Sequence, residues 1–411
     1  MAARIFERVT FTGSKGDELA ARLDLPAGPA KATAIFAHCF TCSKDVVAAS
    51  RVSEHLTREG IAVLRFDFTG LGSSGGDFGN TNFSSNVEDL ELAAKWLTEN
   101  RSAPQILVGH SLGGAAVAMA AANIPSVKAV ATIGAPSEVE HVAMIFDSSV
   151  ETIAEHGEAL VKLAGREFCI QQQFLDDLRD VALADVVGEW KGAWMFLHSP
   201  IDNTVGIDHA AALYAAAKHP KTFVSLDDAD HLLTRPLDAE YAASMIATWA
   251  MRHIDDERGL TAAPDATAPV VVQEAGQGKF LQHVVAGEHR FLADEPLSVG
   301  GFDAGPTPYD LLGAALGTCT SMTMRMYGER KGFDFDTVTV EVSHDRIHAD
   351  DCESCADDRT GQVDVFTRRI SIDAPNLSAE DRARLIAIAD RCPVHRTMEA
   401  SSVIETIDVD S

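Results

Sequence analysis

From residue 34, hydrophobic residues gather in short runs that alternate with longer amphipathic stretches. Runs rich in Val, Ile and Phe predict strands, namely AIFAH, IAVLRFDF, ILVGH, VKAVATIGAP, AWMFLHS and TFVSL. Stretches such as VEDLELAAKWLTEN follow most of them and predict helices. Strands that alternate with helices form a mostly parallel sheet covered on both faces, so the first half is predicted to be an α/β fold.

The alternation is interrupted between Glu138 and Glu189, which predicts a small lid insertion over the sheet. The helical YAASMIATWAMRHI closes the first half and is followed by GLTAAPDATAPV, whose Ala, Thr and Pro pack poorly. We therefore predict a first domain over residues 1–255, a linker over 256–269 and a second domain over 270–411.

The second domain has a different pattern. Strand-like VVVQEA, FLQHVVA and HRFLA precede a helix from Pro308 to about Gly332, which we expect to be buried along most of its length. The strands TVTVEVSHDR and QVDVFTRRISID, the helix SAEDRARLIAIADR and a last strand, SSVIETIDV, follow. Runs of strands broken by segregated helices predict an α+β domain with a long central helix.

Composition narrows the function. Hydrophobic residues make up 46% of the 411 residues, as in soluble globular proteins, and the net charge is −27. This charge repels phosphate backbones and anionic lipid surfaces, so we expect no nucleic-acid or membrane partner. The N-terminus lacks the apolar core of a secretory signal, and seven cysteines are too sparse for a disulfide-rich domain. We expect a cytoplasmic protein with mostly reduced thiols.

ILVGHSLGG contains a GxSxG pattern, with Ser111 at its centre, between an apolar strand and an Ala-rich helix. This tight turn accepts only small residues beside the serine and lifts its hydroxyl to the helix N-terminus. A serine also needs a base and a carboxylate, in the chain order Ser, Asp, His. Asp202 and His231 each follow a later strand and fill these roles.

Other residues compete for the two roles. His198 lies at a strand end and His209 in a helical pattern, where core or surface roles are commoner. The carboxylates that compete with Asp202 less well are Asp208, Asp228 and Asp230.

Acyl transfer also needs backbone donors for the oxyanion, which we assign to the amides of Phe40 and Leu112. With these features, residues 1–255 resemble the α/β-hydrolase family, from the HGx loop at His38 to the final histidine. Cys39 stands where such loops usually carry glycine. Cys39 and Cys42 form a CxxC that fits a redox pair or, better, two packed thiols beneath the loop.

Two cysteines of the second domain stand out. Cys319 lies in the middle of the long helix, where a cysteine is normally a small core residue. Cys392 precedes Pro393 and so occupies a helix N-cap, where the helix dipole and the charges of Arg391 and Arg396 favour a thiolate.

With these cysteines, residues 270–411 resemble the OsmC/Ohr family of thiol-dependent hydroperoxide reductases. The resemblance implies an intertwined homodimer in which Cys319 and Cys392 are the reactive pair, one attacking the peroxide and the other resolving the sulfenic acid. Family precedent gives the attack to the helix cysteine. Tyr309 stands where these peroxidases hold an acidic residue, with Asp310 beside it, and Arg290 is a candidate for their activating arginine.

The segment SHDRIHADDCESCADD brings His344, His348, Cys352 and Cys355 close together in sequence. A zinc site, a redox pair that feeds electrons to Cys319 and Cys392, and a loop without a special role all fit. We assign no metal and expect no cofactor.

The leading hypothesis is a serine esterase for small carboxylic esters, fused to a domain that can reduce an organic hydroperoxide with a dithiol. Two alternatives stay open. In one, peroxide reduction is the main activity and the hydrolase domain delivers substrate. In the other, the second domain is a non-catalytic scaffold for dimerisation.

Overall fold

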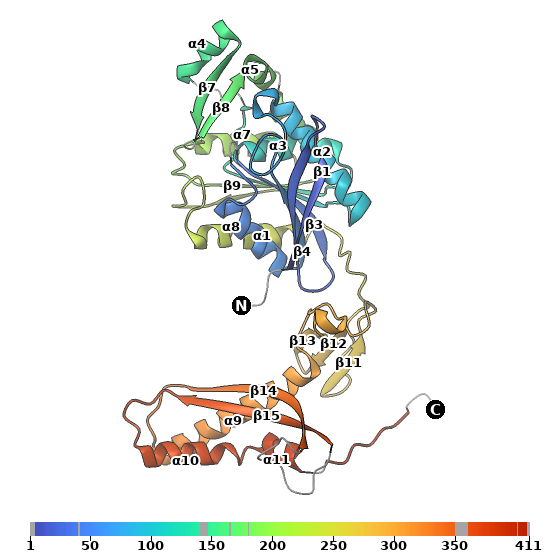
Figure 1. Cartoon of the computed structure of the whole chain (residues 1–411), viewed down its shortest axis with the longest axis vertical. Helices are drawn as coiled ribbons and strands as arrows, with labels where there is room; N and C mark the ends of the chain where they lie inside the picture. Colours follow the sequence, from blue (N-terminus) through green and yellow to red (C-terminus); the bar gives the residue numbers. More distant parts are fainter. Residues whose placement is uncertain are drawn as a thin grey trace. The chain divides into compact units, whose positions relative to one another are not determined.

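The computed structural model describes residues 5–39, 42–139, 147–163, 166–179, 181–349, 361–400 and 402–408. The chain divides into two compact units, Met1–Leu260 and Thr261–Ser411 (Figure 1). The division falls within the stretch 256–269 that the sequence assigns to a linker. No helix in the described part of the chain is long and apolar enough to cross a membrane.

The first unit is built on an eight-stranded sheet of order β1-β2-β4-β3-β5-β6-β9-β10. β2 pairs antiparallel with both β1 and β4, and all the other pairs are parallel. The strands are β1 Ile5–Thr12, β2 Glu18–Leu25, β3 Ala32–Ala37, β4 Ile61–Phe66, β5 Ile106–His110, β6 Ala129–Ile133, β9 Ala193–His198 and β10 Lys221–Ser225.

Helices cover both faces of this sheet, because its central strands are hydrophobic on both sides. One face packs against α1 and α8, and the other against α2, α3, α6 and α7 (Figure 1). The helices are α1 Val47–Arg58, α2 Phe83–Asn100, α3 Leu112–Ala120, α6 Leu183–Glu189, α7 Ile207–Ala216 and α8 Pro236–Ala250, with short 3-10 turns η1 Phe78–Asn80 and η2 Ala121–Asn123.

The predicted insertion forms a substructure of its own. It consists of α4 Asp147–His156, β7 Glu158–Leu163, β8 Arg166–Gln171 and α5 Gln172–Arg179, with β7 and β8 paired as an antiparallel hairpin (Figure 1). Phe168 of the hairpin packs edge-on against Phe78 of η1, with ring centroids 5.1 Å apart. The insertion is therefore joined to the hydrophobic core beside α2.

The second unit contains two small sheets and four helical segments in its described part. Its strands are β11 Val270–Glu274, β12 Gln282–Ala286, β13 His289–Ala293, β14 Val338–His348 and β15 Gln362–Ile372, and its helical segments are η4 Leu297–Val299, α9 Pro308–Lys331, α10 Ala379–Ala389 and α11 Pro393–Glu399. β11, β12 and β13 form one antiparallel sheet, and β14 and β15 form the other. Thr307 and Asp310 form a capping box that starts α9.

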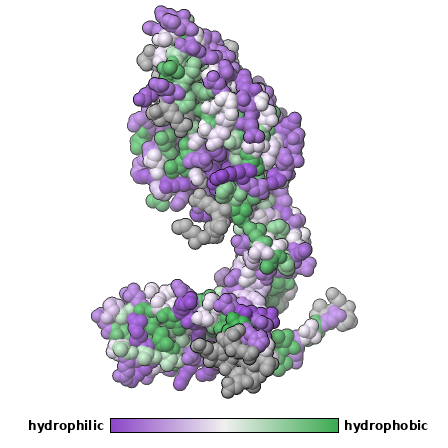
Figure 2. Space-filling view, viewed as in Figure 1, coloured by the Kyte–Doolittle hydropathy of each residue, from purple (hydrophilic) through white to green (hydrophobic). Residues whose placement is uncertain are grey.

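The burial predicted for the long helix is wrong. α9 buries a stripe of small residues with Leu316 and Met324, whereas Leu312, Met322 and Met326 are 46%, 64% and 71% exposed. The reason is that α9 packs mainly on the narrow β14–β15 sheet and on α10, so the rest of its surface lacks a cover within the described chain. Figure 2 shows hydrophobic residues at the surface of this unit.

The predicted last strand is also wrong. Residues 402–408 have no regular secondary structure, and Val403, Ile404 and Ile407 are 88%, 89% and 77% exposed. The alternation of the sequence suits a strand, but no described strand of the chain pairs with this segment. A strand needs such a neighbour for its backbone hydrogen bonds.

Candidate active sites

Ser111 lies in the sharp turn between β5 and α3. Its backbone has φ 55° and ψ −126°, a strained conformation for a residue with a side chain. The turn is closed so tightly that a Cβ at Gly109 would lie 2.3 Å from the Gly113 carbonyl oxygen, and one at Gly113 would lie 2.4 Å from that of His38. The spacing of the GxSxG pattern follows from these contacts.

The structure brings Ser111, His231 and Asp202 into one hydrogen-bonded row. His231 Nε2 is 3.0 Å from Ser111 Oγ, and His231 Nδ1 is 2.6 Å from Asp202 Oδ2. The three residues follow β5, β10 and β9 at the carboxyl edge of the sheet. The side chains of His231 and Asp202 are 10% and 2% exposed, so the row is mostly shielded from water.

The surroundings of Asp202 keep it charged. Burial alone raises its pKa, but the hydrogen bonds from His231, Val205 and Thr204 outweigh burial and hold the pKa of Asp202 below its usual value. The amides of Thr204 and Val205 donate to Oδ1 over 2.8 and 2.9 Å, which leaves Oδ2 to the histidine. A charged carboxylate at this position favours the tautomer with hydrogen on His231 Nδ1.

His110, the variable residue of the pattern, has a role that the sequence analysis missed. Its Nε2 donates to the backbone carbonyl oxygen of His231 over 2.6 Å, and its side chain is fully buried. Burial and the nearby His231 lower the pKa of His110 to about 4, so it is neutral near pH 7. It fixes the segment that carries His231 to the turn that carries Ser111.

The competing residues have other partners. His198 Nε2 donates to the Val205 carbonyl oxygen over 2.8 Å, and burial lowers the pKa of this histidine. His209 Nδ1 is 2.9 Å from Ser137 Oγ. Asp228 forms an ion pair with Arg235, and Asp230 accepts from the Thr234 amide over 3.0 Å. Asp208 lies in the first turn of α7.

The sequence assigns the oxyanion to the backbone amides of Phe40 and Leu112. Leu112 is the first residue of α3, so its amide is free of an intrahelical partner, whereas Phe40 lies outside the described residues.

The loop after β3 is held at Lys44 by buried Asp67, which accepts from the Lys44 amide and ammonium, both over 2.6 Å. Nothing in the local pattern of residues marks Asp67 as the anchor of this loop.

The preferred interpretation of the CxxC as two packed thiols is wrong, because Cys39 and Cys42 form a disulfide. Their Cα atoms are 5.4 Å apart, within the range that a disulfide spans. The two residues are also joined through the backbone, since the Cys42 amide donates to the Cys39 carbonyl oxygen over 3.1 Å.

A second cluster forms around Cys392, the N-cap of α11. Its sulfur accepts from the His395 amide over 3.2 Å, and the neighbouring Cys319 thiol is one of the groups that lower its pKa. Thr320 Oγ1 lies 3.8 Å from it. Cys319 is half-buried and Cys392 fully buried, and neither is in a disulfide. The structure thus brings together the two cysteines that the sequence analysis named.

The cation of this cluster is Arg368 of β15, which the sequence analysis missed. Burial raises the pKa of Cys392, but the hydrogen bonds from His395, Cys319 and Thr320 and the charge of Arg368 hold it below the usual value. Arg290, the candidate named from the sequence, is exposed and donates to the Pro264 carbonyl oxygen, so within this chain it has a different partner. Arg391 and Arg396, predicted to add charge, are exposed.

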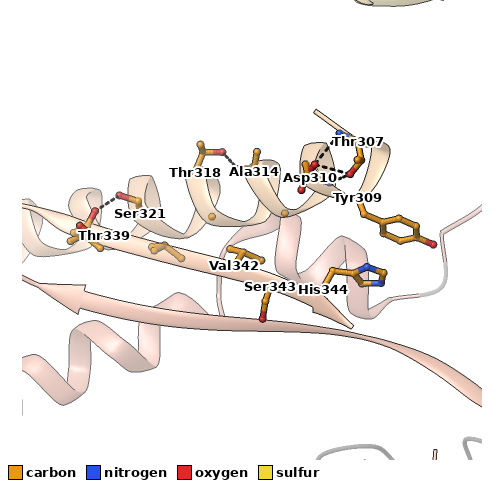
Figure 3. Close-up of a pocket in the computed structure, with 14 residues that line it drawn as sticks. Thr307, Tyr309, Asp310, Ala314, Thr318, Ser321, Thr339, Val342, Ser343 and His344 are labelled. Atoms are coloured by element: carbon orange, nitrogen blue, oxygen red, sulfur yellow. Dashed lines mark hydrogen bonds between the residues drawn. The ribbon is translucent and has the colours of Figure 1, made fainter. Parts of the chain in front are cut away.

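Tyr309 and Asp310 line a groove of about 770 Å³ between α9 and β14 (Figure 3). Tyr309 stacks on His344 with ring centroids 4.0 Å apart, and Asp310 accepts hydrogen bonds from Thr307. Small residues of α9, including Gly313, form much of the wall. Tyr309 is therefore a packing residue, and Asp310 is used by the helix cap.

The proposed zinc ligands Cys352 and Cys355 lie outside the described residues. His344 Nε2 is 3.0 Å from Asp364 Oδ1, and His348 is at the end of β14. Among the residues that the structure describes, no group of three His, Cys, Asp or Glu side chains is arranged to hold a metal.

Comparisons with known proteins assign the two units to families. Residues 28–165 match the family described as serine aminopeptidase, S33, and residues 301–407 match that described as OsmC-like protein. The esterase domain of a Rhodothermus marinus protein is 47% identical, with a TM-score of 0.51, and the match covers 61% of this chain and 99% of that one. The chain is an α/β hydrolase joined to an OsmC-like domain.

Two further solved structures share the fold of the hydrolase domain at low identity. Est1E from Butyrivibrio proteoclasticus with bound ferulic acid is 20% identical with a TM-score of 0.51, covering 60% of this chain and 99% of that one. Mouse alpha/beta hydrolase domain-containing protein 10 is 21% identical with the same TM-score and coverage. No curated protein matches the chain.

Proposed function

We propose that the hydrolase domain is a serine esterase for small carboxylic esters, with Ser111 as nucleophile, His231 as base and Asp202 as the carboxylate that orients it. The observation that carries this proposal is the hydrogen-bonded row from Ser111 Oγ through the imidazole to Asp202. The 47% identity to an esterase domain supports ester hydrolysis as the reaction.

The reaction proceeds in two halves. Ser111 Oγ attacks the ester carbonyl carbon while His231 Nε2 takes its proton, and Asp202 stabilises the imidazolium that results. The Leu112 amide, at the start of α3, donates to the oxyanion. His231 then protonates the departing alcohol. Water, activated by the same imidazole, releases the acid and restores the serine.

We propose a second activity, the reduction of an organic hydroperoxide by Cys319 and Cys392. Two neighbouring cysteines that are not in a disulfide support it, since Cys319 helps to lower the pKa of Cys392. Tyr309 supplies no acid to this pair, because it packs on His344. A cycle of disulfide formation needs a dithiol reductant, so we propose the cytoplasm as the compartment.

We also propose that the OsmC-like domain forms a homodimer. The uncovered residues Met322 and Met326 on α9 and the 402–408 segment support a second copy as the cover. A segment with strand-like alternation and no strand beside it in its own chain suits addition to a sheet of the partner.

Parallel assays of the purified chain test these functions. A short-chain p-nitrophenyl ester reports esterase activity, and an organic hydroperoxide with a dithiol reports peroxidase activity. Activity on the ester alone leaves the scaffold alternative for the second domain. Activity on the hydroperoxide alone removes the esterase proposal.

A further inference from the structure

Three hydrogen-bond donors converge on the Cys392 sulfur. The His395 amide donates to it over 3.2 Å, the Thr320 hydroxyl lies 3.8 Å away, and the neighbouring Cys319 thiol acts on it as a third donor. Cys392 and Thr320 are both fully buried, so water does not compete for these bonds. A sulfur surrounded by donors is stabilised as a thiolate, because the charged form accepts hydrogen bonds more strongly than the thiol does.

Arg368 sets the direction of the bond from Thr320. A guanidinium only donates, so the bond of 3.0 Å between Arg368 Nη1 and Thr320 Oγ1 occupies the oxygen as an acceptor. The hydroxyl hydrogen is then available to the sulfur of Cys392. The same nitrogen donates to the carbonyl oxygen of Ala389 over 3.0 Å, which fixes the end of α10 just before the cysteine.

The other polar groups that contact Arg368 lie closer to the protein surface. Asp390 accepts from Arg368 over 2.7 Å, but its side chain is 68% exposed and water screens its charge. His395 Nδ1 accepts from Arg368 over 3.1 Å, so its hydrogen is on Nε2, which donates to the exposed Glu399 over 3.0 Å. The buried route from Arg368 to Cys392 is thus the one that water screens least.

The sulfur atom that is stabilised as a thiolate is not the one that solvent can reach. Cys392 is 0% exposed, whereas Cys319 on α9 is half-buried. A peroxide therefore reaches Cys319 first, although the contacts that stabilise a thiolate surround Cys392.

We propose that Arg368, acting through Thr320, holds Cys392 as a thiolate, and that this thiolate takes the proton of Cys319, which attacks the peroxide. The inference rests on the peroxidase function proposed above and assigns Arg368 and Thr320 as its positioning residues. Cys319 and Cys392 share one proton and one negative charge before the reaction.

The atoms balance as follows in each step. The Cys319 thiolate attacks the outer oxygen of the hydroperoxide and breaks the O–O bond, which gives a sulfenic acid and an alkoxide. The alkoxide takes the shared proton and leaves as an alcohol. Cys392, again a thiolate, attacks the Cys319 sulfur and displaces hydroxide, which gains a proton from solvent. Two electrons pass from the sulfur atoms to the peroxide, and a dithiol later reduces the disulfide.

The test measures the rate at which iodoacetamide alkylates Cys319 in the full chain as a function of pH, resolved by peptide mass spectrometry. Because the two cysteines share one proton in the proposal, this profile reports the ionisation of Cys392, whose pKa lies below its usual value. We expect Arg368→Met to raise the midpoint by about 1 pH unit and Thr320→Val by about 0.5. Cys392→Ser returns it to the ordinary range.

Arg369→Met is the matched control, because Arg369 is the next residue on β15, is exposed and pairs in register with Glu341. It leaves the midpoint unchanged. Thr320→Val is nearly isosteric and carries the test alone if Arg368→Met does not fold. An unchanged midpoint in Thr320→Val and in folded Arg368→Met overturns the inference, even in a chain that reduces hydroperoxides. The expected shifts in a chain without peroxidase activity support the thiolate assignment and remove only the proposed function.

Discussion

The two units bury their hydrophobic residues to very different extents. The hydrolase domain has a large core on each face of its sheet, whereas the clustered core of the OsmC-like domain contains six buried residues in the described chain. Apolar side chains of the OsmC-like domain instead lie at its surface, on α9 and in the 402–408 segment. Because folded monomers rarely expose large apolar patches, the exposed side chains of the OsmC-like domain are the ones that the proposed homodimer would cover.

The two candidate sites differ in the same sense. The residues around Ser111 come from loops at the carboxyl ends of parallel strands, so the sheet itself brings them together at one edge. The residues around Cys392 come from a helix interior, a helix cap and a strand. Four predictions test this comparison.

The largest effect is expected at the nucleophile. Ser111→Ala removes the attacking oxygen and lowers kcat on a p-nitrophenyl ester by roughly 10⁴-fold or more. Dithiol-dependent turnover of hydroperoxide stays unchanged, since the two sites are chemically separate. If the variant keeps most of the esterase activity, Ser111 is not the nucleophile.

The second effect concerns the cysteines. Cys319→Ser and Cys392→Ser each lower dithiol-dependent peroxide turnover by at least about 100-fold, because neither leaves a pair that can form a disulfide. Ester hydrolysis is unaffected, and Cys169→Ser, at the other free cysteine of the described chain, serves as control. After stoichiometric hydroperoxide, mass spectrometry shows a Cys319–Cys392 disulfide; free thiols at both positions speak against the pair.

The third effect is the acid sensitivity of the hydrolase domain. The pKa of His110 is lowered from 6.5 to about 4, so the unfolded chain binds its proton first. Above pH 6.5, neutral, buried His110 therefore adds no penalty from protonation to the folded state. As the pH drops to 4, the free energy of unfolding falls by about 3 kcal/mol, because the unfolded chain takes up this proton and the folded chain does not. We expect the denaturation midpoint of His110→Gln to change less with pH between 4 and 6.5 than that of the unchanged chain. A variant whose midpoint falls as steeply contradicts the prediction.

The smallest effect is expected at the uncovered surface. Ile404→Asp places a charge in the proposed dimer contact and weakens dimerisation by about 2 kcal/mol, or about thirtyfold in Kd. Analytical ultracentrifugation measures it, with Glu405→Ala as a control in the same segment. If the unchanged chain is a monomer, the homodimer proposal is wrong. If the variant dimerises with the same Kd, residues 402–408 do not belong to the dimer contact.

Local sequence patterns were sufficient to predict most of the architecture. Strand and helix periodicity identified the central sheet, and the turn at Ser111 could be predicted because strand, glycines and helix are adjacent in sequence. Asp202 and His231 followed from chain order. The burial of α9 and the last strand were mispredicted, because the described chain provides no cover for the exposed side of α9 and no strand beside residues 402–408.

Long-range side-chain contacts were beyond the sequence analysis. Arg368 reaches Thr320 across 48 positions, and His110 reaches His231 across 121. Neither residue belongs to a pattern that signals its partner. The CxxC of Cys39 and Cys42 was visible in the sequence, but residue type alone does not distinguish a disulfide from two packed thiols.

The bond from His110 to the His231 carbonyl has a consequence for engineering. Nucleophile and base are joined twice, once through the Ser111 hydroxyl and once through the backbone, so the two loops behave as one part. If the GxSxG turn is transplanted into another hydrolase without His110, the nucleophile is transferred. The contact that aligns its base is then lost. The smallest portable unit of this site is the turn together with the loop that carries His231.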